Sequence, residues 1–128
     1  SFLCEKRRAL FLDSINRFAE KIKDLCIPVI VVKNFLCERH STYYDTFSNY
    51  ENVEQIQKIN QELEWCYGQL IACLSDKLPA GVVVADAFGF EELVFTHDDF
   101  PFGRQPNYYN NGYYQRMAIR IGESVHHK

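Results

Sequence analysis

Two short, wholly apolar segments on either side of a long amphipathic one constrain the fold of this chain most. Residues 29–32 (Val-Ile-Val-Val) and residues 82–85 (Val-Val-Val-Ala) hold no polar side chain. Strands covered on both faces are apolar throughout, and parallel sheets are built from such strands. We therefore predict parallel strands over residues 26–32 and 81–86. Pro28 is expected near the start of the first, because proline cannot donate a ladder hydrogen bond.

Helical periodicity marks the segment before the first strand. Apolar residues recur there every three or four positions, which predicts a helix running to about Asp24 with one apolar face. The residues of this stripe are Phe11, Ile15, Phe18, Ile22 and Leu25.

The same spacing predicts two further helices. Apolar residues between positions 53 and 74 indicate a long helix, which ends before Pro79. A capping box, Ser48-x-x-Glu51, or a cap at Asn52 precedes it. Residues 113–121 are predicted to form a closing helix.

The order strand, long helix, strand predicts a parallel β-α-β crossover of right-handed sense. With helices expected on both faces of the sheet, we predict an α/β fold. It would be a three-layer sandwich with a short parallel sheet, Rossmann- or flavodoxin-like. Residues 1–128 would form it as a single domain or as part of a larger one.

Two strands leave sheet edges unpaired, and an exposed apolar edge invites association. We therefore expect either a third strand at residues 91–96 or a strand from elsewhere. That strand would come from a second copy, giving a homo-oligomer, or from an upstream domain.

Charge and cysteine usage argue against several classes of protein. The net charge is −3 and Lys and Arg are dispersed, whereas nucleic-acid binding needs a concentrated basic face. No apolar run approaches the ~20 residues of a membrane-spanning helix, and residues 1–8 do not resemble a signal peptide. Five cysteines without a C-x-x-C pair indicate buried free thiols in a reducing compartment. We expect a cytoplasmic protein with no membrane span and no nucleic-acid partner.

Polar residues that could carry chemistry follow the predicted strands, at residues 33–45 and 86–109. Ligands of open α/β sheets bind beyond the carboxyl ends of the strands. His97, Asp98 and Asp99 are adjacent there, and a histidine beside a carboxylate is a candidate general base. The same triplet is also typical of a polar turn.

His40, which follows the first buried strand, is the second candidate base. The signatures of three large enzyme classes are missing, because the sequence has no P-loop, no G-x-G-x-x-G and no G-x-S-x-G. No second His or Cys lies at ligand spacing from residues 97–99. We expect neither a metal nor a cofactor.

Seven aromatic residues gather between positions 95 and 114. They could stack on sugar rings, or they could form a satellite core that pins this loop. The residues are Phe95, Phe100, Phe102, Tyr108, Tyr109, Tyr113 and Tyr114.

The end of this segment and the order of elements resemble a known family. Gly103-x-x-Pro106, followed by Tyr108-Tyr109 and Tyr113-Tyr114, is similar to the end of a group of bacterial proteins. Those proteins occur with capsule and surface-polysaccharide genes. The order of elements predicted for this chain resembles the C-terminal half of an SGNH/GDSL-type hydrolase domain. Asn60 stands where the bacterial proteins carry an Asn on the long helix.

The chain departs from the family pattern at its catalytic positions. In register with Gly103, Phe100 stands at the place of the catalytic His and His97 at the place of its Asp. The Gly-Asp-Ser nucleophile block is absent. A serine hydrolase needs nucleophile, base, orienting carboxylate and oxyanion hole together.

The resemblance implies a carbohydrate ester hydrolase or O-acyltransferase-related protein of bacterial surface polysaccharide biosynthesis, this chain being its C-terminal part. His97 or His40 would be the base, and Asp98 or Asp99 the orienting carboxylate. The expected substrate-binding residues are Tyr108, Tyr109, Arg104 and Asn60, and the partner would be a carbohydrate or glycan precursor. Two alternatives remain: an inactive glycan-binding or protein-docking module on the same scaffold, and a flavodoxin-like regulatory or nucleotide-binding domain. The missing glycine-rich turn opposes the latter.

Overall fold

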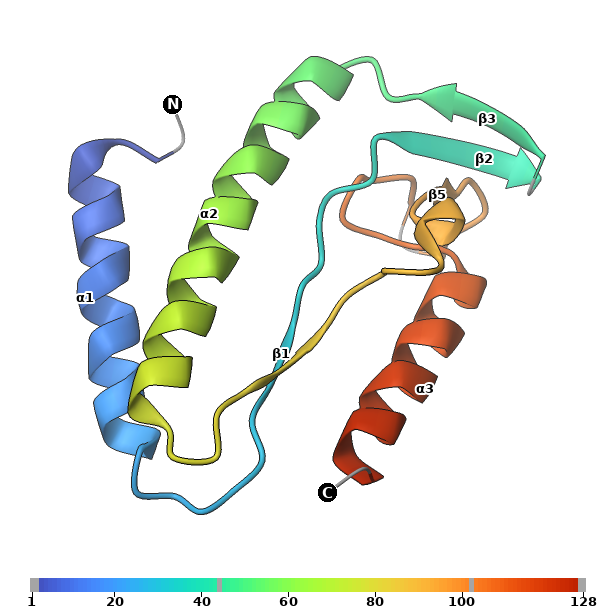
Figure 1. Cartoon of the computed structure of the whole chain (residues 1–128). Coiled ribbons are helices and arrows are strands. Elements are labelled where there is room, and N and C mark those ends of the chain that lie inside the picture. The colour runs from blue at the N-terminus through green and yellow to red at the C-terminus, as the bar shows by residue number, and fades with distance from the viewer. Residues whose placement is uncertain (1–2, 44, 102, 127–128) are drawn as a thin grey trace.

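The computed structural model describes residues 3–43, 45–101 and 103–126 and shows a mixed arrangement of helices and strands (Figure 1). The helices are α1 (Glu5–Ile22), α2 (Val53–Lys77) and α3 (Asn111–His126), in the three segments where periodicity predicts them. Within the described ranges, none of these helices combines the length and the hydrophobicity needed to cross a membrane.

The two apolar segments pair in parallel, and α2 connects them, so the predicted β-α-β unit is confirmed. The strands are β1 (Ile30–Val32) and β4 (Val83–Ala85). Both are shorter than predicted. Ahead of β1, the backbone N–H of Ile27 donates to the carbonyl of Leu25 at 2.8 Å, which is a turn contact rather than a ladder contact.

Apolar clusters lie on both faces of this strand pair. In Figure 1, α1 and α2 lie on one side of the pair and α3 lies on the other. The buried residues on the side of α1 and α2 are Ala19, Val31, Leu74 and Leu78. The buried residues on the side of α3 are Cys37, Ala85, Phe90, Tyr109, Tyr113 and Met117.

Burial of β4 is less complete than its sequence predicts. Val84 lies opposite Val31 in the register, yet its side chain is 40% exposed while Val31 is 7% exposed. The buried residues of α1 and α2 gather around Val31, so this face is covered at β1 and left partly open at β4.

Within residues 33–52, where the sequence pattern predicts no strand, a hairpin forms. β2 (Arg39–Tyr43) and β3 (Thr46–Asn49) pair antiparallel. Threonine and aromatic residues favour strands even in a polar segment, and the ring of Phe47 packs edge-on against Phe95 at 5.0 Å. Ser48 lies in β3, so the expected capping box does not form. Asn52 precedes α2 without a side-chain cap bond.

The third strand expected at residues 91–96 does not join the central pair. Glu91–Leu93 forms a short 3-10 helix, η1, and β5 (Thr96–His97) pairs in parallel with β2. The described residues therefore form two separate sheets, with orders β1-β4 and β3-β2-β5.

The five cysteines are free thiols, but the expectation that they are buried holds only in part. Cys37 is fully buried, and this burial raises the pKa of its thiol to about 12. Cys66 and Cys73 are half-buried between helices, whereas Cys4 and Cys26 are exposed.

Candidate functional site

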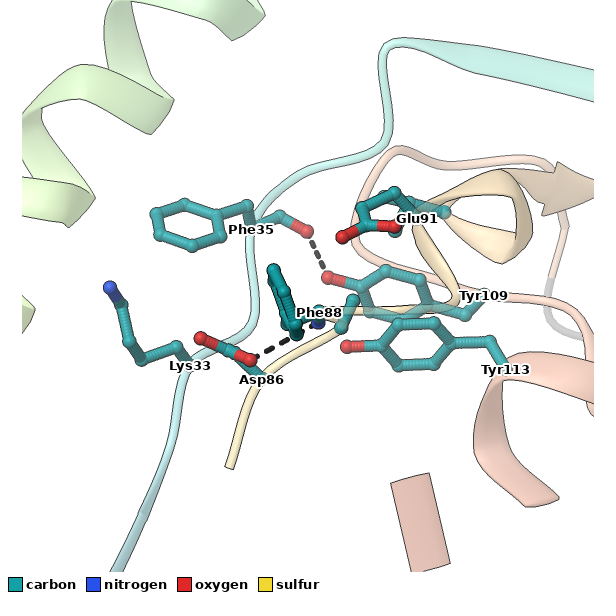
Figure 2. A pocket seen from close by; sticks show the side chains of 9 residues that line it. Lys33, Phe35, Asp86, Phe88, Glu91, Tyr109 and Tyr113 are labelled. Carbon is teal, nitrogen blue, oxygen red and sulfur yellow. Dashed lines mark hydrogen bonds between the residues drawn. The ribbon is translucent and has the colours of Figure 1, made fainter. Parts of the chain in front are cut away.

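A pocket of about 300 Å³ lies at the carboxyl ends of β1 and β4 (Figure 2). The chain leaves β1 through Lys33 and Phe35, and it leaves β4 through Asp86 and Phe88. Parallel strands end at the same edge of a sheet, so these two segments meet there. The other lining residues are Ala87, Glu91, Val94, Tyr109 and Tyr113.

Four of the nine described residues that line the pocket are aromatic. Tyr109 and Tyr113 are buried and stack with centroids 3.9 Å apart. The Tyr109 hydroxyl donates to the carbonyl of Phe35, and the Tyr113 hydroxyl donates to Asn34 Oδ1 at 2.6 Å. Burial raises the pKa of Tyr113 to about 12 and raises that of Tyr109 further, so both hydroxyls stay neutral.

Phe88 is the exposed aromatic residue of this pocket. Its side chain is 78% exposed, more than that of any other large hydrophobic residue described. Gly89 follows with φ +91°, a backbone conformation that L side chains rarely adopt, and it lets the chain turn directly after Phe88. Arg120 of α3 donates to the carbonyls of Asp86 and Phe88 and so fixes this turn.

Two carboxylates and one amine supply the polar part of the pocket. Asp86 Oδ1 accepts from the N–H of Phe88 at 3.1 Å, and Glu91 Oε1 accepts from the N–H of Gly89 at 2.9 Å. The Gly89 contact is the main reason that the pKa of Glu91 is lowered. Among the described residues, no hydrogen bond is donated to the second oxygen of either carboxylate. Lys33 is paired with Glu64 at 3.0 Å.

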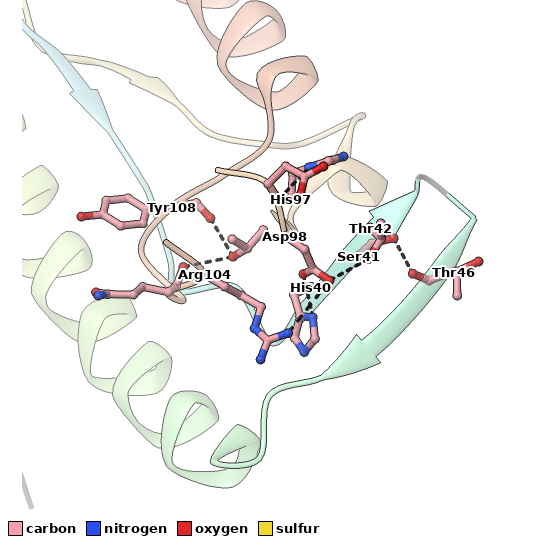
Figure 3. Close-up of polar contacts among 11 residues, drawn as sticks. His40, Ser41, Thr42, Thr46, His97, Asp98, Arg104 and Tyr108 are labelled. Atoms are coloured by element: carbon pink, nitrogen blue, oxygen red, sulfur yellow. Dashed lines mark hydrogen bonds and ion pairs between the residues drawn. The ribbon is translucent and has the colours of Figure 1, made fainter. Parts of the chain in front are cut away.

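A second polar centre joins His40 to Asp98 (Figure 3). β2 carries His40, and Asp98 directly follows β5, so the parallel pairing of these strands brings the two side chains together. His40 Nδ1 lies 2.9 Å from Asp98 Oδ1, and the Thr42 hydroxyl donates to Asp98 Oδ2 at 2.9 Å. A carboxylate accepts, so His40 donates from Nδ1 and its Nε2 is the basic nitrogen of the neutral ring.

Electrostatics keep Asp98 ionised. Burial opposes its charge, but the hydrogen bonds from Thr42 and His40 outweigh burial and lower the pKa of Asp98. Arg104 lies 4.0 Å from the same carboxylate and is half-exposed. The hydroxyls next to His40 in sequence are engaged elsewhere, because Ser41 donates to the carbonyl of Thr46 and Thr42 donates to Asp98.

The remaining predicted residues lie apart from this pair. His97 and Asp99 line a separate pocket of about 250 Å³ with Phe100 and Asn110, and the N–H of Asp99 donates to His97 Nδ1 at 3.2 Å. This geometry is the polar turn that the triplet also predicts.

The predicted substrate-binding residues are also dispersed. Tyr108 stacks on Phe100 at 4.6 Å, while Tyr109 lines the pocket beyond β1 and β4. Asn60 holds the backbone N–H and carbonyl of Leu36 at 2.8 and 2.9 Å, so its amide fixes the segment after β1. Phe102 lies outside the described residues.

Sequence reasoning located the segments of the pocket but missed most of its residues. Lys33 and Asp86 are the first polar residues after the two apolar runs, and this position was the available signal. No sequence signal marked Phe88 and Glu91. The turn that exposes Phe88 and holds Glu91 depends on hydrogen bonds from Arg120, far along the chain. Among the described residues, no three His, Cys, Asp or Glu side chains gather as metal ligands.

No protein-family model, curated protein or solved structure matches this chain.

Proposed function

We propose that this chain binds a carbohydrate in the pocket at the carboxyl ends of β1 and β4, as part of an SGNH-like three-layer α/β domain. The observation that carries the proposal is Phe88, a large ring that is 78% exposed at a pocket containing two carboxylates. A flat apolar ring suits the C–H face of a sugar, and carboxylate oxygens accept hydrogen bonds from its hydroxyls. The partner would be a glycan or glycan precursor of a bacterial surface polysaccharide.

The size and chemistry of the pocket favour binding over catalysis. A volume of about 300 Å³ lies at the lower end of small-molecule sites, which favours one sugar residue over a longer glycan. Among the described residues, its lining includes no histidine, serine or cysteine, so these residues offer no serine or cysteine nucleophile with a histidine base. The tyrosine hydroxyls are held by Phe35 and Asn34.

Saturation-transfer NMR with neutral monosaccharides and their O-acetyl derivatives tests this function. We expect transfer to sugar ring protons with the wild-type chain and its loss in Phe88→Ala. Phe18→Ala is the matched control, because Phe18 is an exposed phenylalanine on α1, outside the pocket. Equal transfer for all three proteins, or none for the wild type, would contradict glycan binding at this pocket.

A second candidate function is ester hydrolysis or acyl transfer, and the 2.9 Å contact between His40 and Asp98 favours it. An orienting carboxylate on Nδ1 leaves Nε2 to act as a general base. The hydroxyls of Ser41 and Thr42, next to His40 in the sequence, donate to the carbonyl of Thr46 and to Asp98. The nucleophile would therefore be a residue other than these two.

Hydrolysis of 4-nitrophenyl acetate by wild type, His40→Ala and His97→Ala separates the two candidate bases. We expect His40→Ala to lose activity and His97→Ala to keep the wild-type rate, because His40 has the carboxylate partner. Equal rates in all three proteins would leave this second function without a base in the chain.

A further inference from the structure

The two carboxylates of the pocket are held against the backbone beside Phe88, the residue whose ring is exposed. Asp86 Oδ1 accepts from the N–H of Phe88 at 3.1 Å, and Glu91 Oε1 accepts from the N–H of Gly89 at 2.9 Å. In the view of Figure 2, the ring of Phe88 lies between the side chains of Asp86 and Glu91. A sugar that stacks on this ring therefore presents its ring substituents to carboxylate oxygens.

These two carboxylates form no ion pair with a described residue. Asp86 and Glu91 are absent from the ion pairs of the part of the chain that the structure describes. Lys33, the amine that lines the pocket, is instead paired with Glu64 at 3.0 Å, and its side chain is only 16% exposed. A cleft that holds carboxylates without counter-ions raises the local concentration of cationic ligands.

Arg120 of α3 also acts on this site, but it does not neutralise it. Its guanidinium donates to the backbone carbonyls of Asp86 and Phe88. The N–H of Gly89 is the main cause of the lowered pKa of Glu91, and the charge of Arg120 adds to it, so Glu91 stays ionised. Carboxylates therefore outnumber cations around the pocket, with Asp86, Glu91 and Glu64 against Lys33 and Arg120.

We propose that the sugar bound in this pocket carries a protonated primary amine, as an unacetylated amino sugar does, and that the amine donates to Asp86 and Glu91. The inference rests on the carbohydrate binding proposed above. An ammonium group brings a positive charge and three N–H donors, whereas a sugar hydroxyl brings one donor and no charge. Its hydrogen bonds to carboxylates are charge-assisted and about twice as strong as neutral ones.

A metal ion is the other cation that two carboxylates could attract. Calcium takes six to eight oxygen ligands and magnesium requires near-ideal octahedral geometry. Among the described residues, no three His, Cys, Asp or Glu side chains gather as ligands. An ammonium group needs only hydrogen-bond acceptors, and the face of an aromatic ring such as Phe88 attracts it further. The described part of the pocket therefore suits an amine better than a metal ion.

Isothermal titration calorimetry of the full chain with glucosamine, glucose and N-acetylglucosamine at pH 6 tests the proposal, since the free sugar amine is protonated at this pH. We expect glucosamine to bind at least about fivefold more tightly than either neutral sugar, because its hydrogen bonds are charge-assisted. High salt should reduce this advantage. Equal affinity for the three sugars would overturn the amine and leave glycan binding standing. No binding of any of them would contradict glycan binding and this inference together.

Two variants test whether the carboxylates hold the amine. Asp86→Asn and Glu91→Gln keep an oxygen that can accept from the turn, so the turn should persist. Each should lower the ratio of glucosamine affinity to glucose affinity by about threefold or more. Glu92→Gln is the matched control and should keep the wild-type ratio, because Glu92 is an exposed neighbouring carboxylate that does not line the pocket. A ratio that both pocket variants leave unchanged, or that Glu92→Gln lowers equally, would overturn the proposal.

Discussion

Asp98 shows at the scale of one residue how distant segments make a site. Its two oxygens contact His40 and Thr42 of β2, and its own N–H donates to the carbonyl of Ser41 at 2.9 Å. These contacts join residues more than 50 positions apart, so neither adjacent sequence reveals them. His40 and Asp98 were therefore predictable as candidate residues, but the contact between them was not.

Asp98→Asn should lower the free energy of unfolding by about 1–2 kcal/mol at pH 6, because hydrogen bonds to a charged group are lost. The pKa of Asp98 is lowered in the folded chain. Its stabilisation is therefore complete above the unfolded value, about 3.9, and is lost as pH falls through the folded value. Urea unfolding at pH 6 and pH 3 should show a smaller difference between wild type and variant at pH 3. An equal difference at both pH values would contradict this role.

At the scale of elements, Asn110 ties the loop after β4 to the start of α3. Its buried side chain accepts from the N–H of Tyr113 at 2.9 Å and donates to the carbonyls of Leu93 and Phe95 at 2.8 and 3.0 Å. One amide thus caps a helix and holds the chain from the end of η1 to the start of β5. The sequence shows an Asn-Asn-Gly stretch there, which marks a helix start but not these long-range partners.

Asn110→Ala should cost about 2–3 kcal/mol, from the lost helix cap and two buried carbonyls left without their partner. Asn111→Ala is the control. Because Asn111 is exposed, this variant should have a free energy of unfolding within about 0.5 kcal/mol of the wild type. Urea unfolding measures both. Similar stability for the two variants would show that Asn110 is not the residue that joins these elements.

Helices were the part of the fold that the sequence predicted best, because the spacing in α1 and α2 records burial on one side of a helix. The β2–β3 hairpin was missed, since its residues are mostly polar and exposed and therefore show no alternation. β5 was missed for a different reason. Its two residues become a strand only through pairing with β2, a contact that no local pattern encodes.

At the scale of the molecule, stability depends on the β1–β4 pair and the helices on its two faces. Val31→Asp should abolish cooperative folding, with a loss above about 3 kcal/mol, because it buries an unpaired charge between α1 and α2. Val84 lies opposite Val31 in the strand pair and on the same face, but it is 40% exposed. Val84→Asp should therefore lower the free energy of unfolding by about 1 kcal/mol or less. Circular dichroism melting curves compare the two. Equal losses would contradict the uneven covering of this face.

The proposed carbohydrate-binding pocket lies between the segments that leave β1 and β4. Chemical-shift mapping of the labelled chain during titration with the saccharide that gives the strongest saturation transfer tests it most directly. We expect shifts that saturate together at the amides of Lys33, Phe88, Gly89 and Glu91, and no change at His40 or His97. Saturable shifts confined to His97, Asp99 and Asn111 would place the ligand in the other pocket and contradict the claim.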